Sequence, residues 1–288
     1  MPRPRLGSTI QLGCGPIASA LLSLSLLSLL GCAAVPLEQA NSLTSYDGLT
    51  SNNGRLTKAS YKVSSGALGA ARTIYIEPTD VSATAAVSIK KFSDRALVAN
   101  VISRALCIGV SDRFEVVSRK EDADLVVHAT ITQIVPTNAT IAGLSAATSL
   151  GASVFSSIPV PRLPMGLGGL SVEAEATMRD GNQAGAMVWA KGANFVTTSA
   201  RISQIGDAYS LAASFGDDFS KMLVSGKTPF KGLPKIPSGQ RIKSGLGGKP
   251  KYPACDTFGR SPGLKDFAAS QIGMPPSWTD KQRSTGGH

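Results

Sequence analysis

The chain has 288 residues, 42% of them apolar and 17% charged, a composition that excludes a disordered protein and fits a globular core. Its formal charge of +10 lies mainly at the C-terminus: residues 226–288 contain eleven basic residues against three aspartates, whereas residues 6–225 carry no net charge. A nucleic-acid-binding domain would carry a basic stripe on its folded elements. We therefore expect no nucleic-acid partner.

The N-terminus has the pattern of a secretory signal. Arg3 and Arg5 precede an apolar run over residues 17–30. This run is shorter than the roughly 20 residues that a membrane-spanning helix needs. Residues 29–32 (Leu-Leu-Gly-Cys) resemble the lipobox of bacterial lipoproteins, in which the cysteine is acylated and becomes the new N-terminus.

Lipidation of Cys32 would make the lipid bilayer the first partner of this protein. A lipobox cysteine carries several acyl chains, and more than one chain is needed for a stable anchor. Ala33 follows Cys32 where an aspartate would signal retention at the inner membrane, which favours the periplasmic face of the outer membrane. Ordinary signal cleavage near Ala33–Ala34 and an uncleaved anchor are the alternatives.

The chain is expected to have four parts. Residues 1–31 form the lipoprotein signal peptide, and residues 32–70, rich in Ser, Gly, Asn and Thr, form a tether. Residues 71–225 form a mixed-sheet domain. The Pro/Gly-rich basic tail, residues 226–288, has little expected regular structure.

The first half of the domain predicts strands around one long helix. Residues 72–77 alternate apolar and polar side chains and stop at Pro78, as a strand should. A helix capped by Ser88 or Ser93 should run to about Ile108. One face of this helix is predicted to be buried: Phe92, Ala96, Ala99, Ile102 and Leu106. Two more strands are expected over residues 113–118 and 124–135.

The second half of the domain predicts a hairpin and a second long helix. Residues 140–155 favour a weak helix. Residues 170–179 and 184–198 flank Asp180-Gly181-Asn182, a hairpin turn. A helix over residues 202–224 should present one apolar face: Ile202, Ile205, Tyr209, Ala212, Phe215, Phe219 and Met222.

This order of elements predicts an α+β (or α/β) fold, a two-layer mixed β-sheet packed against two long helices. After processing, two cysteines remain, Cys107 and Cys255. In an oxidising compartment these two cysteines could form a disulfide, which would link the tail covalently to the domain. Alternatively, Cys107 packs as a small apolar side chain and Cys255 is unrelated to it.

Several short segments occur in a distinctive order. They are residues 43–49 (Leu-Thr-Ser-Tyr-Asp-Gly-Leu), 74–78, 123–127, 131–132 with 136–138, and 172–176 (Val-Glu-Ala-Glu-Ala). These segments resemble an uncharacterised bacterial lipoprotein family, the domain-of-unknown-function family numbered thirty-three thirteen. Together they span about residues 42–225 and omit the tail. The resemblance implies an envelope lipoprotein and assigns no catalytic residue.

No catalytic constellation, cofactor site or metal site is evident. Three Gly-rich stretches (residues 166–169, 226–228 and 245–249) lack the spacing or the following helix of a phosphate loop. Glu173 and Glu175 lie on one face of a strand, and a polar outer face explains them more simply than a glycosidase pair. A serine nucleophile would need His128 or His288 as its base.

We therefore expect a non-catalytic binding or scaffold module in the cell envelope. Its sheet face or its basic tail would bind another envelope protein or an anionic cell-wall or lipopolysaccharide partner. The alternatives are a cell-wall or lipid hydrolase that uses Glu173/Glu175 or a serine with His128, and a small-ligand or lipid carrier. A carrier would need an apolar cavity large enough for an acyl chain.

Overall fold

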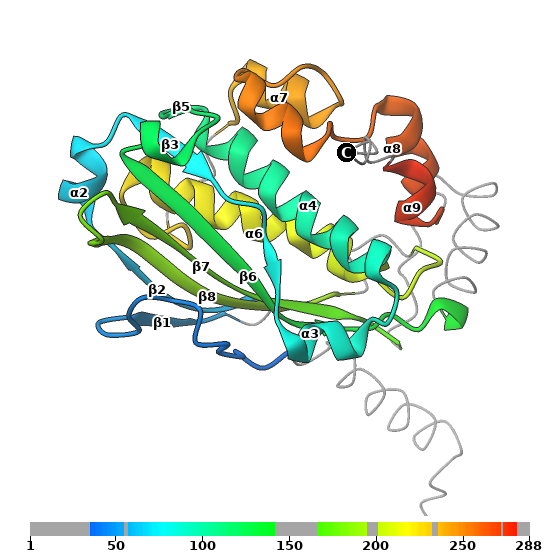
Figure 1. The fold of residues 1–288 in the computed structure, drawn as a ribbon. Coiled ribbons are helices and arrows are strands. Elements are labelled where there is room, and N and C mark those ends of the chain that lie inside the picture. The colour runs from blue at the N-terminus through cyan, green and yellow to red at the C-terminus, as the bar shows by residue number, and fades with distance from the viewer. Residues whose placement is uncertain are drawn as a thin grey trace, which may run out of the picture. The chain divides into compact units, whose positions relative to one another are not determined.

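The computed structural model describes residues 35–54, 57–141, 166–194, 201–231, 236–271 and 273–280. Contacts within the chain separate Met1–Gly31 from Cys32–His288, and all described residues belong to the second unit. Within them the structure confirms the predicted mixed α+β fold (Figure 1).

One mixed sheet forms the centre of this unit. Its strands are β1 (Thr50–Asn53), β2 (Thr57–Val63), β3 (Thr73–Ile76), β4 (Asp80–Val81), β5 (Glu115–Val116), β6 (Leu125–Val135), β7 (Gly169–Met178) and β8 (Gln183–Gly192). The order across the sheet is β1-β2-β8-β7-β6-β3-β5, and β4 pairs with β6 beyond the end of β3. Strands β1, β2, β8, β7 and β6 are antiparallel, whereas β3 and β4 run parallel to β6.

The predicted hairpin is confirmed as β7 and β8. Gly181 adopts φ +83°, a left-handed conformation that glycine reaches without steric cost. The Met178 amide donates to the Asn182 carbonyl at 2.8 Å and closes the turn. The turn sets the register between β7 and β8. Because side chains alternate along a strand, this register determines which residues of β7 face the helices.

Two helices, α4 (Phe92–Val110) and α6 (Gly206–Ser225), pack together and cover one face of the sheet (Figure 1). The core lies between these layers. Trp189 of β8 meets Phe215 edge-on at 5.6 Å, and Phe215 stacks on Phe219 at 5.9 Å. The predicted apolar face of the second helix is therefore buried, except that Ile202 precedes the helix and is exposed.

The first long helix differs from its prediction at both ends. It runs through Gly109 to Val110, and it starts at Phe92, whose side chain is 75% exposed. The spacing of Phe92 fits the buried face, but Phe92 is the first residue of α4 and its side chain faces solvent. The predicted strand over residues 113–118 shortens to the two residues of β5, and most of the weak helix predicted over 140–155 lies outside the described residues.

The prediction that residues 32–70 form a tether is wrong. Strands β1 and β2 lie inside that range, and β2 pairs with β8 along its whole length. Helix α2 (Ser65–Ala70) then leads into β3. The polar composition of this segment reflects the exposed edge strand β1 and the mostly half-buried strand β2, which sequence composition alone does not distinguish from a loop.

The tail is also more structured than predicted. Its described residues form α7 (Gly239–Gly245), the 3₁₀ helix η3 (Pro253–Phe258), α8 (Leu264–Gln271) and α9 (Pro276–Thr279). Elements α7 and η3 pack on α4. Long-range contacts, which the local Pro/Gly content does not reveal, order this part of the chain.

Candidate functional site

The second face of the sheet carries two buried carboxylates, Glu173 and Glu175, which we call the glutamate pair. Alternation along β7 turns Val172, Ala174 and Ala176 toward the helices and the glutamate pair to the opposite face. On an open face both side chains would be hydrated, yet Glu173 is 0% exposed and Glu175 6% exposed. Their predicted place on a polar, solvent-facing surface is therefore wrong, because another part of the chain covers them.

Residues 35–49, the docked segment, provide this cover and reach the carboxylates from 131 residues away in the sequence. Glu173 accepts hydrogen bonds from the Ser42 amide at 3.2 Å and the Ser42 hydroxyl at 2.6 Å through one oxygen. Its other oxygen accepts from the Tyr46 hydroxyl at 2.8 Å. Both oxygens of Glu173 are thus satisfied by the docked segment.

Glu175 is held in the same way, two residues further along β7. It accepts from the Thr44 amide at 2.8 Å and the Thr44 hydroxyl at 2.7 Å, and the Gln183 side-chain amide donates to it at 2.8 Å. Hydrogen bonds to a charged group are among the stronger ones in proteins. With every carboxylate oxygen hydrogen-bonded and both side chains buried, the glutamate pair does not offer the acid and nucleophile of a glycosidase.

Apolar contacts complete this interface. Leu43 packs with Ala186 and Val188 of β8, and three partly buried side chains border this cluster: Leu37, Tyr46 and Leu49. Val35 is buried at the start of the segment. A Cβ on Gly169 would lie 2.2 Å from the Val35 side chain, so Val35 sits directly on the backbone at the start of β7.

The phenol of Tyr46 makes the interface sensitive to alkaline pH. Burial, followed by the hydrogen bond to Glu173, raises the pKa of Tyr46 from 10.0 to about 12. A group with a raised folded pKa contributes stability that is complete below its unfolded pKa and is lost as the pH rises through the folded value. Between pH 10 and about 12 the docked segment should therefore weaken.

We expect Tyr46→Phe to remove this alkaline contribution. Urea denaturation as a function of pH should show the wild-type free energy of unfolding falling more steeply above about pH 10 than that of the variant. All other tyrosines are common to both proteins, so their titration cancels in the difference. Parallel pH profiles would contradict the role assigned to Tyr46.

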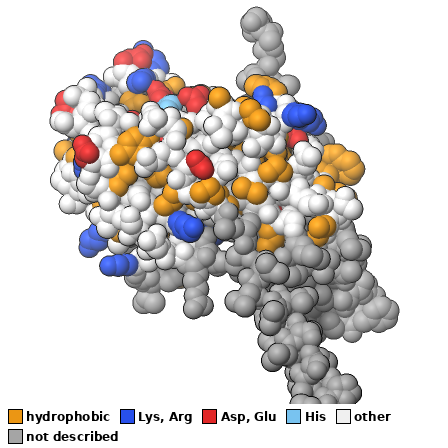
Figure 2. Space-filling model, turned by 90° about the horizontal axis from the view of Figure 1, so that it is seen from below, with side chains coloured by type: hydrophobic (Ala, Val, Ile, Leu, Met, Phe, Trp, Pro, Cys, Tyr) orange, Lys and Arg blue, Asp and Glu red, His pale blue; other side chains and the backbone are white. Residues whose placement is uncertain are grey.

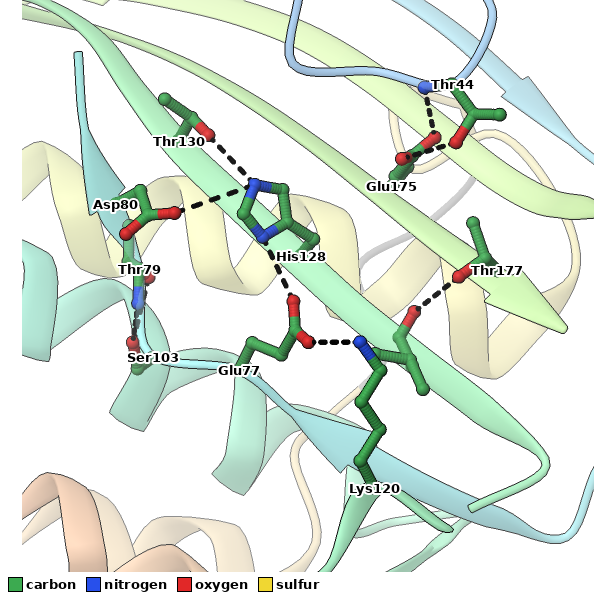
Figure 3. A network of polar contacts seen from close by, with 11 residues as sticks. Thr44, Glu77, Thr79, Asp80, Ser103, Lys120, His128, Thr130, Glu175 and Thr177 are labelled. Atoms are coloured by element: carbon green, nitrogen blue, oxygen red, sulfur yellow. Dashed lines mark hydrogen bonds and ion pairs between the residues drawn. The ribbon is translucent and has the colours of Figure 1, made fainter. Parts of the chain in front are cut away.

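A second polar cluster lies on the same face of the sheet, around His128 of β6. Figure 3 shows His128 between Glu77 and Thr130, with Nδ1 3.1 Å from a Glu77 carboxylate oxygen and Nε2 3.2 Å from the Thr130 hydroxyl. Lys120 pairs with the other Glu77 oxygen at 2.7 Å, and an Asp80 oxygen lies 3.8 Å from Nε2. Seen from below, acidic and basic side chains gather at the upper left of the molecule (Figure 2).

Both ring nitrogens of His128 thus have partners, and the hydroxyl among them belongs to a threonine. This geometry corresponds to a structural histidine whose hydrogen bonds are satisfied and not to the base of a serine nucleophile.

The described residues hold no group of three or more His, Cys, Asp and Glu side chains that could bind a metal ion. His288 lies outside the described residues.

The C-terminal part of the described chain is fixed to α4 by covalent and ionic contacts. Cys107 of α4 and Cys255 of η3 form a disulfide across 148 residues of sequence. Farther along, buried Asp280 accepts from both terminal nitrogens of Arg104, at 3.3 and 2.5 Å, and from the Tyr209 hydroxyl at 2.6 Å. We call Arg104, Tyr209 and Asp280 the tail clamp.

Part of the tail's basic charge is used in docking. Arg241 pairs with Asp217 of α6, and the Lys251 ammonium donates to the Ser111 carbonyl at 2.9 Å. The cations that remain exposed on the tail include Lys243, Lys249 and Lys265. They are the part of this positive charge that could meet an anionic partner.

Next to the disulfide lies a small pocket of about 80 Å³, lined by Tyr75, Pro78, Val116 and Phe258 among others. This volume is well below the several hundred Å³ that small-ligand sites typically have. Cys32, the predicted lipidation site, lies outside the described residues. In the part of the chain that is described, no helix is long and apolar enough to cross a membrane.

Comparison with known proteins gives one family and a distant structural likeness. The sequence model for a protein of unknown function, DUF3313, matches residues 38–219. The PelC dodecamer from Paraburkholderia phytofirmans is 8% identical, covers 60% of this chain and 99% of the PelC chain, and gives a TM-score of 0.36. A single-residue variant of the same PelC is also 8% identical, covers 60% of this chain and 98% of the variant chain, and gives a TM-score of 0.33. A search of curated proteins gives no match.

The matched range contains the docked segment from residue 38 onward and the glutamate pair, and it ends within α6. Two of the segments that carried the sequence resemblance, residues 43–49 and 172–176, therefore form one interface. No two-residue period in the sequence marks this contact, because residues 41–47 (Asn-Ser-Leu-Thr-Ser-Tyr-Asp) are all polar except Leu43.

Proposed function

The chain belongs to the DUF3313 family of proteins of unknown function, and we propose that it is a non-catalytic envelope lipoprotein anchored through acylated Cys32. The bilayer would be the periplasmic face of the outer membrane. The folded unit would serve there as a binding or scaffold module for another envelope component. The observation that carries this proposal is the docked segment, which starts directly after the lipobox.

Val35 is three residues beyond Cys32 and is already buried against Gly169. Three residues of extended chain span at most roughly 11 Å. An acylated Cys32 would therefore hold the folded unit close to the lipid headgroups, without a long spacer. The five hydrogen bonds from the docked segment to the glutamate pair would connect this attachment to the centre of the sheet.

The burial of the glutamate pair beneath the docked segment favours a binding role over hydrolysis. The surfaces left for a partner among the described residues include the region around His128 and the exposed tail lysines. Positive charges on the tail are suited to phosphates of lipopolysaccharide or to an acidic envelope protein.

Replacing Cys32 with serine tests the anchor. We expect Cys32→Ser to abolish globomycin-sensitive processing and palmitate incorporation, and to move the protein out of the membrane fraction. The matched control is Cys14→Ser, which changes a cysteine upstream of the apolar core and should alter none of these properties. If the Cys32→Ser protein remained membrane-bound to the wild-type extent, lipid anchoring would be refuted.

A further inference from the structure

The turn between α3 (Ala83–Ser88) and α4 presents two apolar side chains to solvent. Val87 is 78% exposed and Phe92 is 75% exposed. Between them, Lys90 and Lys91 are also exposed. Exposed apolar side chains beside lysines on a surface turn are typical of segments that enter a membrane interface, where rings lie at the headgroup level.

This turn, residues 87–92, is held firmly in place. The guanidinium of Arg95 donates to the carbonyls of Ala86 at 3.2 Å, Ile89 at 2.6 Å and Lys90 at 3.1 Å. Ile89 is buried beneath the turn. The Arg95 guanidinium also lies 5.7 Å from the centre of the Phe92 ring. The exposed side chains are thus displayed by a fixed backbone whose carbonyls are satisfied.

The turn lies at the same end of the sheet as the start of the docked segment. The Ser82 amide, just before α3, donates to Ile131 of β6, and its hydroxyl donates to Thr132. Strand β6 then continues to Val135, which pairs with Gly169, the residue under Val35. In Figure 1, α3 lies at the same edge of the unit as the first residues in dark blue.

We propose that this turn inserts into the bilayer that holds Cys32, with Val87 and Phe92 in the interfacial layer and Lys90 and Lys91 on lipid phosphates. The proposal rests on the lipid anchor proposed above. That anchor brings the membrane to this end of the sheet, because Val35 is only three residues beyond Cys32. Asp94 lies 3.7 Å from the Lys91 ammonium and offsets part of its charge, whereas Lys90 has no acidic neighbour among the ion pairs of the described residues.

A single-cysteine label can test this contact in the full lipidated protein. In the mature chain Cys32 would be acylated and Cys107 is bridged to Cys255, so a cysteine introduced at position 87 would be the one free thiol. The matched control is Glu115→Cys on β5, an exposed residue at the opposite end of β6. Both variants are labelled with the environment-sensitive dye NBD. They are reconstituted into vesicles of phosphatidylethanolamine and phosphatidylglycerol at about three to one.

We expect blue-shifted emission at position 87 and quenching by doxyl-labelled lipid several-fold stronger than at position 115. Phe92→Cys, labelled in the same way, should agree with Val87→Cys and guards against a local distortion by either substitution. Reversing the charges with Lys90→Glu and Lys91→Glu should reduce the quenching at position 87.

Vesicle flotation separates the proposed lipid anchor from the proposed contact of the turn with lipid. If the protein floats with the vesicles but positions 87 and 92 are as solvent-exposed as position 115, the turn does not contact lipid. If the lipidated protein does not float, the anchor itself is refuted, and this contact with it.

Discussion

Replacing Glu173 with alanine is expected to release the docked segment from the sheet. The variant removes the acceptor for three hydrogen bonds and leaves the Ser42 and Tyr46 hydroxyls without their partner. Loss of a charged acceptor in a buried network typically costs more than a neutral hydrogen bond. We expect the free energy of unfolding to fall by about 2–4 kcal/mol.

Urea denaturation and limited proteolysis with chymotrypsin measure this effect. The variant should be cut rapidly after Tyr46, whereas the wild type should resist at that bond. The control is Glu115→Ala, which removes an exposed glutamate from β5 and should leave both stability and the cleavage pattern unchanged. Protection of Tyr46 in the Glu173→Ala protein would mean that apolar contacts alone hold the docked segment.

Replacing both Cys107 and Cys255 with serine is expected to give the second large effect. The bridge closes a loop across 148 residues of sequence, and it restricts the unfolded chain. Native disulfides closing long loops typically contribute about 2–5 kcal/mol, so the double variant should unfold at clearly lower urea concentration. Wild-type protein measured with a reductant should match the variant, since both lack the bridge.

Peptide mapping without reduction checks the same bond chemically. It should recover one cross-linked peptide containing Cys107 and Cys255. Two thiols that react with an alkylating agent in the native protein would show that the bridge does not form. In that case, the tail would depend on the tail clamp and on the contacts of α7 and η3 with α4.

The sequence predicted those parts of the fold whose signal is local. Alternation in residues 124–135 predicts β6, the Asp180-Gly181 turn predicts the hairpin, and the spacing of Tyr209, Phe215 and Phe219 predicts the buried face of α6. Each of these patterns arises from side chains within about a dozen residues of one another. Tertiary packing did not override them.

The failures share a different cause, which is dependence on distant residues. A single glutamate at 173 has the same local pattern whether solvent or residues 42–46 cover it. Phe92 fits a helical apolar face, but as the first residue of α4 it is exposed, because no distant part of the described chain covers it. The tail is rich in Pro and Gly, yet Arg104 and Cys107 of α4 hold it in place. The residues that cover Glu173 and hold the tail are distant in the sequence, so local composition does not reveal these contacts.

Mass spectrometry of the mature N-terminal peptide tests the central proposal most directly. Trypsin should release the peptide from Cys32 to Arg55 from protein purified out of the native membrane. We predict that it begins at Cys32 and carries the mass of a diacylglyceryl group plus one amide-linked acyl chain. A peptide that begins at Ala33 or Ala34, or an unmodified Cys32 within an uncleaved N-terminus, would contradict the account.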